Sequence, residues 1–206
     1  KLLSFDGNTI QEYEVPYVDK NITRKFTDCI VVGNKLFALP FGETQGINSV
    51  IEFDTVTNNF KAHNLSGVDF AKKYNAGVLL NKTVIALPYG DEHVNDSNLA
   101  LKFDTESGES EQFKIQQNFG GKYRFRSGIK YFDEAYFFPS GTPACPILVI
   151  NEQGQITNEL HETNVLFGRP IVFNDYIHVI KIDLTTKAHK LCIYDRNLQV
   201  VNESVI

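Results

Sequence analysis

Two stretches about fifty residues apart nearly repeat one another, and this repeat restricts the possible folds more than any other feature. The stretches are "RKFTDCIVVGNKLFALPFG" (24–42) and "KKYNAGVLLNKTVIALPYG" (72–90). Both begin with basic residues and an aromatic residue, continue with two apolar runs, and end with proline, an aromatic residue and glycine. A repeat of this length is the signature of a modular architecture, so the periodicity has to be followed along the whole chain.

The spacing between the aromatic residue and the proline recurs along the chain. A fourth copy, "LFGRPIVFNDYIHVIK", keeps the aromatic residue as Phe167 but has Lys181 where the proline is expected. Two runs of this kind, joined by a short polar turn, predict a β-hairpin that ends at the proline, where no ladder donor is needed. In three copies the two residues are fourteen apart: Phe26 and Pro40, Tyr74 and Pro88, and Phe125 and Pro139.

A second element follows each of these hairpins, as in "SVIEFDTVTNNF" (49–60). It has alternating apolar residues, then Asp or Asn, then a turn and further alternation, which predicts a second hairpin. A fifth copy, "KLLSFDGNTIQEY", opens the chain. The turn residues, 44 to 50 positions apart, are Asp6, Asp54, Asp104, Asn151 and Asp195.

Each unit therefore contains four short strands, A to D in chain order. A four-stranded antiparallel unit every 44 to 50 residues predicts an all-β protein with the β-propeller fold, in which strand A of each blade is innermost. We expect a single domain over 1–206, with four complete blades and an N-terminal half blade. The predicted ranges are 1–15 for the half blade and 26–65, 74–115, 125–160 and 167–204 for the full blades.

The predicted strands do not divide into whole blades, because there are four A–B pairs but five C–D hairpins. We expect residues before Lys1 to supply the missing inner strands, which gives at least five blades in the intact protein. The alternative is a closed ring of four blades with a spare hairpin.

The repeats, with their proline–aromatic–glycine ending and their apolar–x–Phe/Ile–Asp segment, resemble kelch-like and related bacterial or protist propeller repeats. The resemblance covers nearly the whole chain. The adjacent glycine pair and the tryptophan of kelch blades are missing, as is the Trp-Asp of WD40 blades. The resemblance implies the fold and no particular function.

Composition excludes some partners. A net charge of −5 argues against nucleic acid, which requires a basic surface. No apolar run is long enough to span a bilayer, so we expect no membrane partner. The three cysteines have no zinc spacing, and their odd number favours reduced thiols and a cytoplasmic location, whereas five Asn-x-Ser/Thr sequons favour secretion; the compartment stays open.

The long connections, before strand A and after strand B, should lie together at one mouth of the propeller, where binding residues usually sit. In three blades a basic residue lies next to the aromatic residue just before strand A, and in the fourth blade Arg169 lies on the far side of Phe167. These cations could attract an anionic ligand at the mouth; alternatively, the aromatics pack between blades and the basic side chains cover them. The candidate ligand-binding residues here are Lys25, Lys73, Tyr74, Arg124, Arg126 and Arg169.

An acidic loop, "YGDEHVNDSN" (89–98), follows the second strand B. Its Asp91, Glu92 and Asp96 are candidate calcium ligands, although the loop lacks the glycine and terminal glutamate of an EF-hand. The alternative is a solvated turn, and we predict no metal or other cofactor. His93 in this loop and Glu43 in the equivalent loop of the first blade complete the candidate mouth residues.

No catalytic motif is present among the histidines or serines, so we expect a non-catalytic binding or scaffold propeller. Its loop face would hold a protein, peptide or glycan partner, and a small anion is a further candidate. The alternative is a lyase or metal-assisted hydrolase acting on an anionic substrate. It would use Lys73, Arg124 and Arg169 as electrophilic groups and His93 or Glu43 as the base. A purely structural segment is the third interpretation.

Overall fold

The computed structural model contains only β-strands and connections among the residues that it describes, which confirms the all-β prediction. No helix in this part of the chain is long and apolar enough to cross a membrane. The described ranges are 2–5 (backbone only), 8–16, 25–41, 47–66, 74–89, 99–115, 125–139 and 145–206.

Four antiparallel sheets follow one another along the chain, each with its strands in sequence order. Blade 1 contains β3 (Phe26–Val32), β4 (Lys35–Pro40), β5 (Ser49–Asp54) and β6 (Asn59–Asn64). Blade 2 contains β7 (Tyr74–Leu80), β8 (Thr83–Pro88), β9 (Leu99–Asp104) and β10 (Ser110–Lys114). Blade 3 contains β11 (Phe125–Tyr131), β12 (Glu134–Pro139), β13 (Ile147–Ile150) and β14 (Ile156–Leu160).

Blade 4 departs from this plan in its innermost strand. Strand A was predicted as one strand but is split into two short strands, both paired with strand B. The predicted half blade at the N-terminus is a separate two-stranded hairpin. Blade 4 contains β15 (Val165–Phe167), β16 (Ile171–Phe173), β17 (Tyr176–Asp183), β18 (His189–Tyr194) and β19 (Val200–Val205), and the hairpin contains β1 (Leu2–Phe5) and β2 (Ile10–Tyr13).

The fourteen-residue repeat of the sequence is a register of the A–B hairpin. The aromatic residue that starts strand A pairs directly with the proline that ends strand B, so that Phe26 faces Pro40 and Phe125 faces Pro139. In blade 4, Phe167 faces Lys181, which occupies the place of the proline. Register is fixed by the turn and by the apolar pattern, and for this reason the spacing recurs.

Turn chemistry also matches the sequence prediction. In the C–D turn of blade 1, Asp54 Oδ1 accepts hydrogen bonds from the backbone N–H groups of Val56 and Thr57, at 2.8 and 2.9 Å. Asp104, Asn151 and Asp195 do the same in the other blades. Such side-chain turns close tight hairpins without a long loop.

One loop prediction was wrong. The expectation of a long connection after every strand B would make "DLTTKAH" (183–189) such a connection at the mouth of blade 4. In the structure β17 continues to Asp183, and the connection is a tight turn in which Asp183 Oδ1 accepts from Thr185 N and Thr186 N. The C–D turns have the same hydrogen-bonding pattern. An Asp at the end of a strand therefore closes a tight turn here as well.

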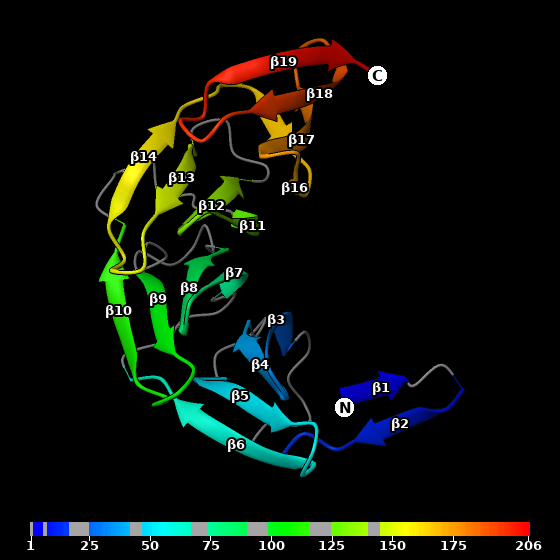
Figure 1. The fold of residues 1–206 in the computed structure, drawn as a ribbon, viewed down its shortest axis with the longest axis vertical. Coiled ribbons are helices and arrows are strands. Elements are labelled where there is room, and N and C mark those ends of the chain that lie inside the picture. Colours follow the sequence, from blue (N-terminus) through cyan, green and yellow to red (C-terminus); the bar gives the residue numbers. More distant parts are fainter. Residues whose placement is uncertain are drawn as a thin grey trace.

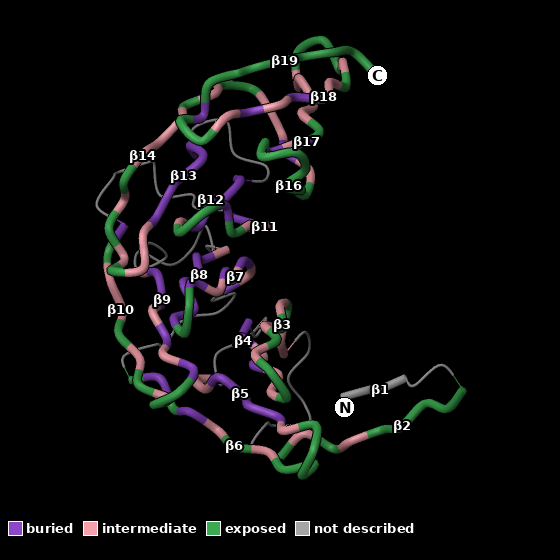
Figure 2. The backbone as a smooth tube through the Cα atoms, in the orientation of Figure 1, coloured by how far each residue is buried: buried purple, intermediate pink, exposed green. Residues whose placement is uncertain are grey.

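The blades stand side by side along an arc, with the innermost strands on its concave side and β6, β10, β14 and β19 on its convex side (Figure 1). The hairpin β1–β2 lies next to blade 1, and the two ends of the arc do not meet, unlike the closed four-blade ring considered as an alternative. Three apolar clusters fill the spaces between successive blades. Burial is accordingly highest in blades 2 and 3 and decreases toward the ends of the arc (Figure 2).

Candidate functional site

Each innermost strand contains one extra residue just after its aromatic anchor. In blade 2, Tyr74 pairs with Pro88 and the next pair is Ala76 with Leu87, so that Asn75 is unmatched. Blades 1, 3 and 4 have the same one-residue excess. A β-bulge re-aims the side chains around it, and here it does so on the concave side of the arc. The polar residues in these bulges are Thr27, Asp28, Asn75, Arg126 and Arg169.

The bulges of blades 1 and 2 bind the backbone of the following blade. Thr27 Oγ1 donates to the carbonyl oxygen of Tyr74 at 2.8 Å, and Asn75 Nδ2 donates to that of Phe125 at 3.4 Å. Tyr74 and Phe125 are the first residues of the innermost strands of blades 2 and 3. These hydrogen bonds therefore link the start of each strand A to the start of the next one.

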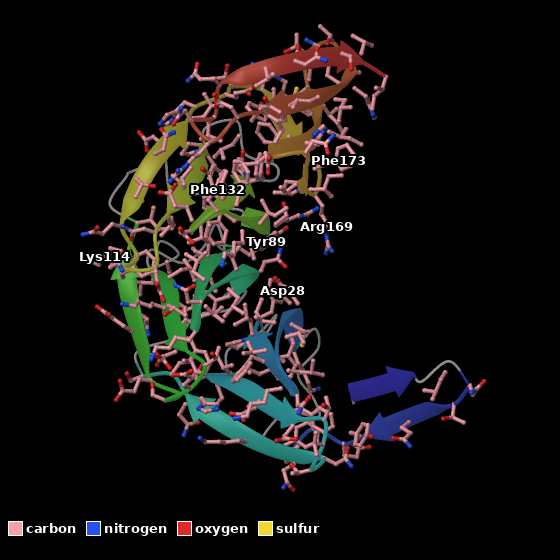
Figure 3. All side chains as sticks on the ribbon, in the orientation of Figure 1. Asp28, Tyr89, Lys114, Phe132, Arg169 and Phe173 are labelled. Carbon is pink, nitrogen blue, oxygen red and sulfur yellow. The ribbon has the colours of Figure 1, made fainter. Side chains whose placement is uncertain are left out.

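Asp28 is the acidic member of the set. Its Oδ2 accepts a hydrogen bond from Gly77 N in blade 2, and its Oδ1 accepts one from Cys29 N, both at 3.0 Å. Burial raises the pKa of Asp28, while the two backbone hydrogen bonds and the positive charge of Arg169 act against this rise. Arg169 belongs to blade 4, so the concave side brings together charges from opposite ends of the arc (Figure 3).

Arg126 is positioned by aromatic residues of the preceding blades. Its Nη2 donates to the Tyr89 hydroxyl at 3.0 Å, and its guanidinium carbon lies 5.6 Å from the centre of that ring. The Tyr89 ring contacts the Phe41 ring at 5.7 Å, edge to face. Tyr89 and Phe41 are the aromatic residues of the repeated proline–aromatic–glycine ending. This ending therefore builds a contact that runs from blade 1 through blade 2 to blade 3.

We call Asp28, Tyr89, Arg126 and Arg169 the axial cluster. The side chains of Arg126 and Arg169 are exposed, and Asp28 is half-buried. A guanidinium group can donate two parallel hydrogen bonds to a carboxylate or phosphate, so Arg126 and Arg169 are chemically suited to an anionic ligand.

The structure describes four of the predicted mouth residues. Arg126 and Arg169 are in the axial cluster. Lys25 is half-buried, and its carbonyl oxygen accepts a hydrogen bond from Phe41 N. Tyr74 is fully buried between blades 1 and 2, which is the packing role that the alternative interpretation gave to the aromatic anchors. The remaining candidates lie outside the described residues: Lys73, Arg124, Glu43, His93, Asp91, Glu92 and Asp96.

Sequence reasoning missed Asp28 and Tyr89. A signal for Tyr89 was present in the repeated ending, where an aromatic residue follows proline in two blades. Asp28 gave no such signal, because a bulge is not visible in the alternation of a single strand. Over the ranges that can be described, no group of three or more His, Cys, Asp and Glu side chains could hold a metal ion.

A second polar cluster lies at the edge of the interface between blades 3 and 4. Lys181 Nζ is 2.9 Å from Glu162 Oε2 and 2.8 Å from Glu203 Oε2. The Tyr194 hydroxyl donates to Glu162 at 2.6 Å, and the Cys192 thiol donates to Glu203 at 3.2 Å. Burial raises the pKa of Cys192 to about 11. These groups satisfy one another's hydrogen-bonding capacity, as expected of an ion network with a structural role.

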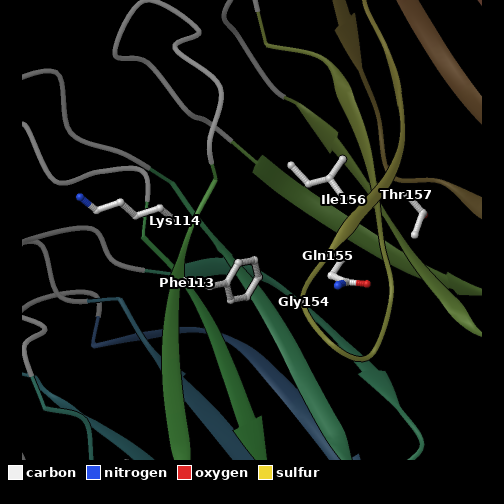
Figure 4. Close-up of a pocket in the computed structure, with 6 residues that line it drawn as sticks. All are labelled: Phe113, Lys114, Gly154, Gln155, Ile156 and Thr157. Atoms are coloured by element: carbon white, nitrogen blue, oxygen red, sulfur yellow. The ribbon is translucent and has the colours of Figure 1, made fainter.

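A groove of about 550 Å³ lies on the outer rim, between β10 and the β13–β14 hairpin (Figure 4). Phe113 and Ile156 supply its apolar surface and Lys114 a positive charge. The Phe113 ring packs over Gly154, where an added Cβ would lie 3.3 Å from the ring. Its full lining is Phe113, Lys114, Gly154, Gln155, Ile156 and Thr157.

No family model matches the chain, and no curated protein sequence matches it significantly. Several solved structures resemble it in fold. They include BamB from Moraxella catarrhalis, with a TM-score of 0.50, 15% identity, and coverage of 74% of this chain and 39% of that one. The extracellular domain of the putative one-component system BT4673 from B. thetaiotaomicron has a TM-score of 0.55 and 12% identity, and covers 95% of this chain and 26% of that one.

A third similar structure is the cobalt-substituted apocarotenoid oxygenase of Synechocystis, with a TM-score of 0.56, 11% identity, and coverage of 87% of this chain and 50% of that one. The chain thus spans between about a quarter and a half of the length of these structures. Together with the four-stranded sheets, the likenesses define an all-β protein with a β-propeller-type fold. At such identities they show the fold alone. The kelch-like resemblance stays a prediction.

Proposed function

We propose that the chain is a non-catalytic binding module of the propeller type, which recognises an acidic group of a protein, peptide or glycan partner on its concave side. The observation that carries the proposal is the pair of exposed guanidinium groups, Arg126 and Arg169, in equivalent bulges of neighbouring blades. Ligand-binding sites in repeat folds generally form where loops from several units converge on a rigid scaffold.

The geometry favours a carboxylate or phosphate over a neutral ligand. Tyr89 fixes the Arg126 guanidinium by a hydrogen bond and a ring contact, so that less side-chain entropy is lost when an anion binds. Asp28 lies in the same region and disfavours a ligand that carries negative charge along its whole length. We therefore expect a partner with a localised acidic group.

The alternative function, an enzyme acting on an anionic substrate, depends on Arg169 and on four residues that lie outside the described ranges: Lys73, Arg124, His93 and Glu43. Within the described ranges no observation specifically favours it. The similar structures include an oxygenase as well as BamB, and they give no preference between the two classes.

The test is calorimetric titration, at low and high salt, with a short peptide of neutral residues that carries a single phosphoserine. We expect binding that weakens with salt, and a loss of about tenfold or more in the Arg126→Gln/Arg169→Gln variant, because charge-assisted hydrogen bonds are removed. Lys130→Gln is the matched control, since Lys130 is an exposed cation on β11, the strand that also carries Arg126. Equal binding by the double variant and the control would refute an anion site in the axial cluster.

A further inference from the structure

The turn between strands A and B of blade 3 contains an aromatic residue at a position where the other blades have Gly or Asn. Each A–B turn has two residues between paired strand ends, and the first of the two has a positive φ in all four blades. In blade 3 this residue is Phe132, with a φ of 53°. A bulky side chain in this left-handed conformation strains the backbone, whereas Gly and Asn adopt it readily. The equivalent residues are Gly33, Asn81 and Asn174.

The Phe132 side chain does not offset this strain by burial. It is 51% exposed (Figure 3), whereas two other aromatic residues of the same hairpin, Tyr131 and Tyr136, are 5% and 0% exposed. The centre of the Phe132 ring lies 4.6 Å from that of the Tyr131 ring. Strained residues cluster at binding sites, and aromatic and Arg side chains are enriched in protein interfaces. Phe132 therefore marks a candidate interaction surface.

A cation from blade 4 already lies on the Phe132 ring. The guanidinium carbon of Arg196, in the C–D turn of blade 4, is 5.2 Å from the ring centre, within the range of a cation–π contact. Two hydrogen bonds from blade 3 hold this turn in place. The Tyr136 hydroxyl donates to Arg196 O at 2.8 Å, and Asn158 Nδ2 donates to Asn197 O at 3.2 Å. The ring and the guanidinium therefore form one surface across the junction of blades 3 and 4.

The equivalent junction of blades 2 and 3 is built from polar hydrogen bonds instead. Glu152 takes the turn position of Arg196, since each follows the Asn or Asp that closes its C–D turn. Its carboxylate accepts from Asn81 Nδ2 at 2.9 Å and from Thr83 Oγ1 at 3.3 Å. At the junction of blades 3 and 4, Arg196 Nη2 lies 3.8 Å from Glu134 Oε2, and the Arg196 side chain is 58% exposed. Blades 3 and 4 thus present an aromatic residue and a cation to solvent where blades 2 and 3 pair polar groups internally.

The charge around the Phe132 ring is mostly negative. The Tyr131 hydroxyl donates to the backbone oxygen of Asp175, which places that residue against the aromatic cluster. Burial raises the pKa of Tyr131, and the carboxylates of Asp175 and Asp195 raise it further, against the lowering effect of Arg196. A negative field favours a cationic ligand. The carboxylates beside the ring and the Arg196 turn are those of Asp133, Glu134, Asp175 and Asp195.

We propose that Phe132 and Arg196 are the centre of a second binding site, which takes a basic side chain, Arg or Lys, of a protein partner. The partner's cation would lie against the exposed part of the Phe132 ring, as Arg196 does from within the chain, and the surrounding carboxylates would attract it. Phe132 lies just past the end of β11 that is opposite to Arg126, about 20 Å away at the rise of an extended strand. The site is therefore separate from the axial cluster and selects the opposite charge.

Fluorescence anisotropy with a labelled heptapeptide tests the site. The peptide has two arginines separated by leucine in a glycine–serine background, and its control has glutamate in place of arginine. The basic peptide should bind, and Phe132→Asn should weaken its binding by at least about fivefold, because the cation–π contact is lost. Phe132→Asn changes no charge, so a general attraction of the basic peptide to an acidic chain would persist. Val56→Asn is the matched control, at a C–D turn residue of blade 1 that is 68% exposed, and should leave the affinity unchanged.

Thermal unfolding of the same variant separates a binding role from a packing role. Asn is the residue of the equivalent turns in blades 2 and 4, so Phe132→Asn should keep the unfolding midpoint or raise it by up to about 4 °C. It should also bind the phosphoserine peptide of the axial cluster as the unmodified chain does. A midpoint that falls by several degrees would show that Phe132 is a packing residue and overturn the proposal. Equal binding of the two heptapeptides, or an unchanged affinity in Phe132→Asn, would overturn it as well.

Discussion

Blades 2 and 4 are built from the same four-strand unit, but the forces that hold them differ. Every residue of β8, the strand B of blade 2, is buried, and blade 2 packs against a neighbour on both faces. Blade 4 has a described neighbour on one face only, the face that points toward blade 3. Every residue of its outer strand β19 is exposed, and Lys181 replaces the proline at the end of its strand B. The comparison teaches that the same repeat can be held by apolar packing on both faces or, at the end of the arc, by packing on one face together with an ion network at the edge of that face.

The largest expected effect comes from removing equivalent leucine and isoleucine side chains in the two blades. Leu87→Ala in blade 2 should lower the free energy of unfolding by about 3 kcal/mol, because it leaves a cavity in a close-packed cluster. Ile180→Ala in blade 4 should cost less than about 1 kcal/mol, since Ile180 is already 43% exposed. Urea unfolding of both variants is the measurement. Similar losses at both positions would show that the face of blade 4 that carries Ile180 is covered in the monomer.

A smaller effect is expected from the ion network of blade 4. Lys181→Met should cost about 2 kcal/mol, between the values for exposed and fully buried ion pairs, because it leaves Glu162 and Glu203 without their shared cation. Lys181→Arg retains the charge and serves as the control in thermal unfolding. If Lys181→Met were as stable as the unmodified chain, the network would not contribute to holding blade 4.

The smallest effect is a pH dependence that comes from the ion network of blade 4. Hydrogen bonds from Lys181 and Lys190 lower the pKa of Glu203 to about 2, from an ordinary value of 4.5. A lowered carboxyl pKa stabilises the folded state fully above the unfolded pKa, and the contribution is lost as the pH falls from 4.5 toward 2.

Unfolding followed between pH 5 and pH 2 should therefore show a shallower loss of stability in Glu203→Gln than in the unmodified chain. Glu111→Gln is the control, since Glu111 lies on β10, the equivalent outer strand of blade 2, with a 4.0 Å contact to Lys102. A Glu203→Gln variant with an unchanged pH profile would contradict the role of this carboxylate.

Much of the fold could be predicted from local sequence because its signals are local. The spacing of Phe26 and Pro40 is a strand register, and Asp54 closes its own turn with neighbouring N–H groups. The candidate site was less accessible. Arg126 and Arg169 were identified from their place beside aromatic anchors, but Asp28 and Tyr89 were not, because their roles depend on a bulge and on residues of other blades.

The sequence by itself determined the repeating unit, the order of its strands and the chemistry of its turns, since each of these depends on residues close together in the chain. Only the tertiary structure decided which polar side chains gather on the concave side and which apolar faces stay open. Those properties depend on contacts between blades about fifty or more residues apart, such as that of Asp28 with Gly77. The alternation of apolar residues in a strand predicts which face of the strand is buried. Which residues of another blade pack against that face depends on how whole sheets pack together.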